Sequence, residues 1–294
     1  MKSWLATLSL IAVTAVWGWT FVIVKDAIAV YGVMPFLAVR FLLAAVVLIG
    51  LRGRRLTRST LRIGWKIGLV LAAGYLLQTW GLRFTTATNS GLITGLFVVV
   101  APLADRALYR TRVQSSSAVA VSLSLVGMIL LTGGSSEHLA LGDLMTLGCA
   151  LAFGLHIALL SRHARHHDPG ALTTAQLLSV AVVFLMAWPV SGTPTFPPRR
   201  VWGAILITGL VASALAYLVQ TSAQRRLSAA RTAVILTMEP VFAGFFGFLL
   251  EGERLRGLQI LGALLILSAL AVGEILPALT RTRRKPPTSP DSQP

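Results

Sequence analysis

Two ionisable residues lie inside long apolar segments of this 294-residue sequence, Arg40 in one and Glu239 in another. A charged side chain at the centre of a bilayer costs about 2.5–3.5 kcal/mol on insertion scales, so each should face the protein interior or a water-filled cavity. Their opposite signs at similar predicted depth leave two interpretations, a permanent ion pair that fixes packing or two poles of a solute-binding site. If they separate, the Glu239 carboxyl group becomes a candidate for proton or ion coupling.

A tyrosine and glutamine pattern occurs twice. Tyr75 and Gln78 are three residues apart, hence on one face of a helix, and the pattern recurs 142 residues later as Tyr217 and Gln220. Hydrogen bonds between neighbouring helices explain such residues in lipid. Two related polar faces are also what a central binding site between two repeats needs, so we include all four residues in the candidate site.

His156 and Trp17 complete the candidate site. A histidine here can bind solute or titrate near neutral pH, or it is a hydrogen-bonded core residue. Trp17 either supplies an apolar wall or anchors its helix at the membrane interface. Three further histidines, at 163, 166 and 167, lie among arginines and indicate a loop rather than a metal site. We expect no metal and no other cofactor, and no phosphate-binding Gly-x-x-x-x-Gly-Lys motif occurs.

The composition identifies the surroundings of these residues. Apolar residues make up 55% of the chain and charged residues 12%, with a mean hydropathy of +0.77. Soluble proteins carry about 25% charged residues, so an extended soluble enzyme is excluded. A bilayer-spanning helix needs about 20 apolar residues. Ten such stretches are predicted, at approximately 4–24, 33–51, 63–82, 87–108, 116–133, 141–160, 172–190, 201–221, 232–250 and 257–276.

Basic residues predict the orientation of these spans. With the N-terminus inside, 19 Lys and Arg fall on the inner side and 6 on the outer side, and Arg40 lies within a span. Cytoplasmic loops retain Lys and Arg, so both termini are predicted to be cytoplasmic in a multi-pass protein of the cell membrane. The net charge of +16 is then explained by topology and lipid contact, without a nucleic-acid partner. The first span is too long for the core of a signal peptide.

The spans divide into two halves of five, residues 1–138 and 139–277, followed by a disordered cytoplasmic tail, 278–294. The Tyr and Gln pattern supports this division, and Ala101-Pro102 pairs with Glu239-Pro240 at an offset of 138. An odd number of spans places the second half in the membrane in the opposite orientation, as in many alternating-access transporters. The predicted fold is therefore an all-α integral membrane protein with ten transmembrane helices in two inverted five-helix repeats.

Several segments in order along both halves carry a family resemblance. They are Trp17-Gly18-Trp19-Thr20-Phe21, Pro35 with Arg40-Phe41, Gly81 to Ala87, Gly91 to Leu96, Gly142-Asp143-Leu144, Glu239-Pro240-Val241-Phe242 and Glu251-Gly252-Glu253-Arg254-Leu255. In these segments the chain resembles the EamA-type members of the drug/metabolite transporter superfamily. The resemblance implies a transporter of two five-helix repeats that usually exports small metabolites or amino acids. Tyr109-Arg110-Thr111-Arg112 replaces the family's usual Gly-Glu-Arg motif in the first half, so the resemblance does not predict which substrate this chain carries.

We therefore predict a secondary transporter, not an enzyme, that exports a small metabolite such as an amino acid by alternating access. It would work as a monomer or homodimer in the lipid bilayer. A multidrug exporter of the same fold is the nearest alternative, and it would not require Arg40. A membrane-embedded lipid-modifying enzyme is less favoured, because such enzymes usually cluster acidic residues or histidines on one membrane face and the acidic residues here are scattered.

Overall fold

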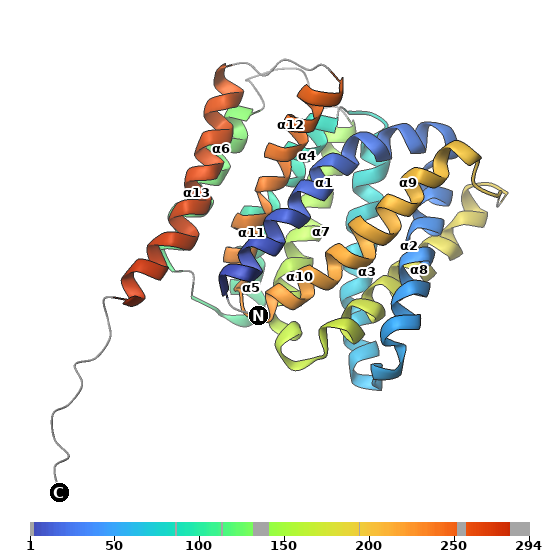
Figure 1. Cartoon of the computed structure of the whole chain (residues 1–294), viewed down its shortest axis with the longest axis horizontal. Coiled ribbons are helices and arrows are strands. Elements are labelled where there is room, and N and C mark those ends of the chain that lie inside the picture. The colour runs from blue at the N-terminus through green and yellow to red at the C-terminus, as the bar shows by residue number, and fades with distance from the viewer. Residues whose placement is uncertain are drawn as a thin grey trace, which may run out of the picture.

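Every regular element in the computed structural model is a helix within the residues it describes, which are 3–85, 87–112, 114–131, 141–193, 195–251 and 257–282 (Figure 1). The helices of the first half are α1 (Ser3–Tyr31), α2 (Val33–Arg52), α3 (Arg58–Gly81), α4 (Ala87–Thr94), α5 (Phe97–Tyr109) and α6 (Ser115–Leu131). Those of the second half are α7 (Leu141–His163), α8 (Pro169–Ser191), α9 (Trp202–Leu206), η4 (Ile207–Leu215), α10 (Ala216–Gln224), α11 (Ala229–Leu236), α12 (Met238–Glu251) and α13 (Gly257–Thr282). Single 3-10 turns precede α3, α8 and α9, at Gly53–Arg55, Ala164–His166 and Arg199–Val201.

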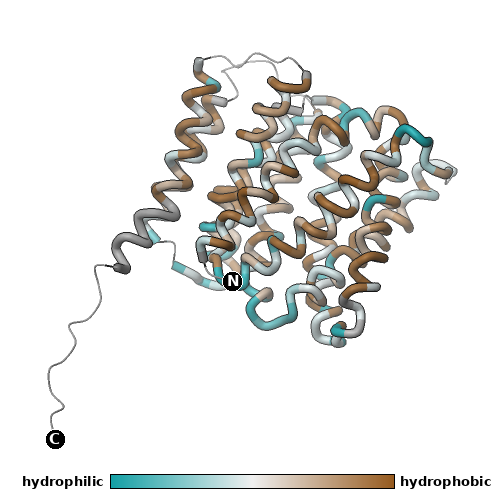
Figure 2. Tube along the Cα trace, in the orientation of Figure 1, coloured by the Kyte–Doolittle hydropathy of each residue, from teal (hydrophilic) through white to brown (hydrophobic). Residues whose placement is uncertain are grey.

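Eight segments of the described chain are long and apolar enough to cross a bilayer, and each coincides with a predicted span. The fifth and tenth predicted spans coincide with the shorter apolar stretches Ser115–Leu130 and Gly257–Val272. Figure 2 shows apolar residues along most of the helix lengths and hydrophilic residues mainly at their ends. The protein is thus an all-helical, multi-pass membrane protein, and the count of ten spans remains a prediction.

Two of these long segments are broken near their middle. A turn at Gly95 and Leu96 separates α4 from α5, and a turn at Thr237 separates α11 from α12. The amide groups at the start of a helix carry partial positive charge, which interacts favourably with an acidic side chain. Glu239 lies in the first turn of α12, directly after the second break.

The helix boundaries repeat along the chain. Helix α4 recurs 142 residues later as α11, and α5 recurs as the part of α12 from Glu239 onward. The first residue of α13 likewise follows the first residue of α6 by 142. This register corrects the pairing of Pro102 with Pro240 at an offset of 138. In the observed register Glu239 corresponds to Phe97. Pro102 lies well inside α5, whereas Pro240 lies in the first turn of α12, where a proline is tolerated.

Close contacts between helices repeat in the same way. The offset between corresponding residues is 136 for α1 with α7 and for α2 with α8, instead of 142. A Cβ atom on Gly18 would lie 2.7 Å from the backbone nitrogen of Ala243, and one on Gly154 would lie 3.1 Å from that of Ala101. Gly154 follows Gly18 by 136 residues, and Ala243 follows Ala101 by 142. The start of α8 likewise follows that of α2 by 136 residues, so Gln176 corresponds to Arg40.

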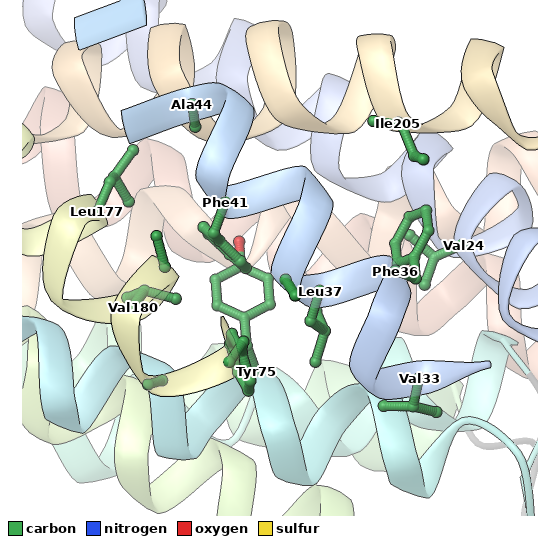
Figure 3. Close-up of a cluster of buried hydrophobic side chains, with 14 of the residues drawn as sticks. Val24, Val33, Phe36, Leu37, Phe41, Ala44, Tyr75, Leu177, Val180 and Ile205 are labelled. Carbon is green, nitrogen blue, oxygen red and sulfur yellow. The ribbon is translucent and has the colours of Figure 1, made fainter. Parts of the chain in front are cut away.

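The largest apolar core surrounds α2. Phe36, Leu37 and Phe41 of α2 are fully buried. Figure 3 shows Phe41 facing Tyr75, with side chains of α8 on the other side of the phenylalanine ring. This packing fixes the face of α2 that carries Arg40.

Helices α6 and α13 pack together at one edge of the bundle (Figure 1). Helix α13 continues to Thr282, so residues 278–282 are helical, in contrast to the predicted start of a disordered tail at 278. Residues 283–294 and the predicted boundary between the halves, at 138 and 139, lie outside the described residues.

Candidate functional site

One cavity inside the bundle is lined by all eight residues singled out from the sequence. These are Trp17, Arg40, Tyr75, Gln78, His156, Tyr217, Gln220 and Glu239. The free volume of the cavity is about 50 Å³. One water needs about 10–15 Å³ measured in the same way, so the cavity holds several waters or a small polar solute.

The two deep charges face this cavity without meeting. Arg40 is 3% exposed and Glu239 is 6% exposed, and within the described residues they form no ion pair. The Arg40 Nε–H donates to Ser213 Oγ at 2.9 Å, and an Nη2–H donates to the Tyr75 hydroxyl at 3.4 Å. The Glu239 side chain makes no hydrogen bond to another described residue. Of the two interpretations of the sequence, the ion pair is absent in this conformation.

The corresponding tyrosines of the two halves meet at the cavity. The Tyr217 hydroxyl donates to the Tyr75 hydroxyl at 2.9 Å, and the rings lie edge to face at 6.2 Å between centroids. Tyr75 thus accepts hydrogen bonds from Tyr217 and Arg40, which leaves its own hydroxyl hydrogen available to an acceptor. The Arg40 guanidinium also lies 4.8 Å from the Tyr75 ring centroid, within cation–π range.

Aromatic walls flank the tyrosines on both sides. Trp17 packs against Tyr217 and Phe153 packs against Tyr75, each with 5.4 Å between ring centroids. Phe153 follows Trp17 by 136 residues, so these are corresponding contacts. The Trp17 indole N–H donates to the Ala212 carbonyl at 2.8 Å, which holds the ring within the bundle rather than at the membrane interface.

The remaining polar residues differ in whether their side-chain atoms have hydrogen-bond partners. His156 Nε2 lies 2.9 Å from Gln176 Oε1, as expected for a hydrogen-bonded core histidine that also lines the cavity. The Gln78 amide donates to Thr94 Oγ1 at 3.2 Å. The Gln220 Oε1 atom is buried and has no hydrogen-bond partner. Buried polar atoms are normally paired, so Gln220 is open to a bound molecule.

Several lining residues were missed from the sequence. They are Thr20, Phe21, Val24, Thr79, Leu82, Phe97, Phe153, Ile157 and Leu236. Most are apolar and carry no sign of the cavity in a hydrophobic sequence. The correspondence between halves was the available signal, because Phe153, His156 and Ile157 follow Trp17, Thr20 and Phe21 by 136 residues.

Two other tryptophans, and the histidines at 163, 166 and 167, do not line the cavity. Trp19 packs against Phe246, and Trp80 lines a separate cavity with Arg83 at the end of α3. His167 Nδ1 lies 2.9 Å from the Thr60 hydroxyl. Within the described residues, no group of three or more His, Cys, Asp or Glu is placed to hold a metal ion.

Comparison with known proteins identifies relatives over the whole helical region. The sequence model of the EamA-like transporter family matches residues 4–133 and again residues 140–272. An uncharacterized transporter of Archaeoglobus fulgidus is 35% identical over 274 residues, which are 92% of this chain and 86% of that protein. A protein of Salmonella typhimurium named "Probable amino-acid metabolite efflux pump" is 22% identical and covers 92% of this chain and 95% of its own length.

A solved crystal structure has the same fold. It superposes with a TM-score of 0.76 over 92% of this chain and 98% of its own length, at 19% sequence identity. At that identity the likeness concerns the fold alone. The two family matches and the 35% identical relative together show that this chain belongs to the EamA-like transporter family.

Proposed function

We propose that this protein is a secondary transporter that exports a small metabolite, such as an amino acid, by alternating access around the central cavity. The observation that carries the proposal is the pair of unpaired opposite charges, Arg40 and Glu239, at one small cavity between corresponding helices. A zwitterionic solute can match both charges. The name of the Salmonella relative supports this class of solute.

The proposed architecture is ten transmembrane helices in two inverted five-helix repeats, 1–138 and 139–277. The double family match and the recurring helix boundaries support it. The start of α1 and the end of α13 lie toward the same end of the bundle (Figure 1), which favours a location of both termini on one side of the membrane, proposed to be the cytoplasmic side. Corresponding halves of opposite orientation allow the cavity to open to either side in turn.

In this mechanism Arg40 receives the anionic group of the solute. Glu239 receives a cationic group, or a proton when the solute has left. Trp17, Tyr75 and Tyr217 form apolar walls with hydroxyl groups at their edge, while Gln78, His156 and Gln220 supply further hydrogen bonds. No covalent step is required, so the protein acts as a transporter and not as an enzyme.

Counterflow in proteoliposomes tests this function. Purified protein is reconstituted with one unlabelled amino acid inside, and the entry of the same labelled amino acid is measured for a panel of solutes. We expect at least one zwitterionic amino acid to exchange above protein-free vesicles. If only lipophilic cations exchange, the protein is instead a multidrug exporter, a function favoured by the aromatic walls. If no solute of either class exchanges, the proposal is wrong.

A further inference from the structure

The third helix of the first half has a counterpart in the second half that is one residue longer. Six buried positions of α3 match buried positions 141 residues later. They are Thr60, Gly64, Ile67, Gly68, Leu71 and Ala72, which match Val201, Ile205, Thr208, Gly209, Ala212 and Ser213 in that order. The next five buried positions match buried positions 142 residues later. They are Gly74, Tyr75, Thr79, Gly81 and Leu82, which match Ala216, Tyr217, Thr221, Ala223 and Gln224 in that order. One residue, Ala214 or Leu215, therefore has no counterpart.

Close contacts independently fix the first of these two registers. A Cβ atom on Gly68 would lie 2.5 Å from the Gln176 carbonyl oxygen, and one on Gly209 would lie 3.0 Å from the Arg40 carbonyl oxygen. Gly209 follows Gly68 by 141 residues, and Gln176 and Arg40 are themselves corresponding residues. The extra residue thus lies between Gly209 and Tyr217.

A π-helical segment, η4, accommodates the extra residue. One residue inserted into a regular α-helix would rotate everything after it by about 100° and would turn Tyr217 and Gln220 away from the cavity. In η4 (Ile207–Leu215) the turn widens instead, so both flanking parts keep their packing. Such segments occur frequently at functional sites.

Segment η4 makes two polar contacts, and for each of them one of the two corresponding residues lacks the group that would make the same contact. Ser213 Oγ accepts the Arg40 Nε–H, and the Ala212 carbonyl accepts the Trp17 indole N–H. The corresponding residues of α3 are Ala72 and Leu71, and the counterpart of Trp17 is Phe153. Alanine has no hydroxyl group, and phenylalanine has no ring N–H.

These contacts leave one part of the Arg40 guanidinium free. Its Nε–H is bound by Ser213 and one Nη2–H by Tyr75, while the other N–H groups bind no described residue. Arg40 lines the cavity at 3% exposure. Guanidinium N–H groups pair well with carboxylates and other oxyanions. We propose that Ser213 of η4 is a positioning residue that holds the Arg40 guanidinium for the carboxylate of the solute.

This inference rests on the proposed function, so it needs one test with solute and one without. The first test measures counterflow of L-leucine and of 3-methylbutylamine, which is leucine without its carboxylate. We expect Ser213→Ala to raise the KM for leucine about five- to tenfold with a maximal rate within about twofold, because hydrogen bonds to charged groups are strong. Ser213→Thr keeps the hydroxyl group and should restore the KM. Any transport of the amine should be unaffected.

Thr208→Val is the matched control. Thr208 is a fully buried residue of the same segment, and its hydroxyl group donates to the Ala204 carbonyl without lining the cavity. If Ser213→Ala and Thr208→Val change KM and rate alike, Ser213 has only a structural role and the inference is overturned.

The second test needs no transported solute and so remains informative if leucine does not exchange. Glyoxal modification of the full-length protein in nanodiscs is followed at each arginine by mass spectrometry. We expect Ser213→Ala to increase the modification rate of Arg40 at least threefold, since its guanidinium is released, while the exposed Arg83 reacts as before. An unchanged Arg40 rate would overturn the inference even if the proposed function holds. Failure of leucine exchange together with a changed rate would count against the choice of solute alone.

Discussion

The two halves of the cavity wall repeat one shape with different charges. Trp17 and Phe153 pack on corresponding tyrosines at the same centroid distance, 5.4 Å. Yet Arg40 corresponds to Gln176, and Glu239 corresponds to Phe97. Each half therefore contributes one charge at a position where the other half is neutral. In the proposed mechanism, symmetric packing lets both halves move alike, whereas asymmetric charge gives a solute one preferred orientation.

The largest expected effect comes from removing this asymmetry at Arg40. Arg40→Gln makes the first half match Gln176, and the anionic group of the solute loses its ionic partner. Truncating a partner of a buried charge pair costs about 2–5 kcal/mol, so we expect transport efficiency for a carboxylate solute to fall about 100-fold. Counterflow measures it, with Arg83→Gln, an exposed arginine outside the cavity, as control. Normal transport by Arg40→Gln would show that the charge difference between the halves is not functional.

The corresponding helix contacts predict a graded loss of stability. A Cβ atom on Gly68 would lie 2.5 Å from a backbone oxygen, and one on Gly209 would lie 3.0 Å from the equivalent oxygen. Overpacking costs about 1–3 kcal/mol, so we expect Gly68→Ala to lose about 2 kcal/mol, roughly a 30-fold change in the unfolding equilibrium, and Gly209→Ala about half that energy. Thermal unfolding in detergent measures both. Gly203→Ala, with open space around its Cβ position, should cause no loss of stability. Equal losses at Gly68 and Gly209 would mean that the two contacts are equally tight.

Glu239→Gln removes the other charge while keeping the shape. We expect proton-driven accumulation to fall about tenfold further than counterflow, because the amide cannot take up a proton. Counterflow needs no net coupling and falls only because the contact with the cationic group of the solute is weakened. The measurement compares both modes in the same vesicles. Phe97→Leu at the corresponding position changes an apolar wall only and should affect both modes equally. Intact accumulation in Glu239→Gln would assign coupling to another group.

The sequence was sufficient to select eight of the residues that line the cavity, most of them because charge and polarity are rare in a hydrophobic chain. Arg40 and Glu239 were selected by their depth, and the tyrosines and glutamines by their repetition. The predicted alignment of the fourth span with the ninth was wrong, because it paired the two prolines, Pro102 and Pro240. The positions of the helix breaks give the correct offset. Ser213 was missed, because a serine within an apolar span carries no sign of its contact with Arg40.

The smallest expected effect concerns Tyr75 and Tyr217, where the two halves meet. The Tyr75 hydroxyl accepts hydrogen bonds from both Tyr217 and Arg40, so Tyr75→Phe removes two contacts, while Tyr217→Phe removes one. A net hydrogen bond contributes about 0.5–1.5 kcal/mol. We expect Tyr75→Phe to raise the KM about threefold and Tyr217→Phe less than twofold. The double variant should resemble Tyr75→Phe, because the bond between the hydroxyls is already lost. Equal effects of the single variants would mean that Tyr75 does not hold Arg40, and orientation of the guanidinium would then depend on Ser213 alone.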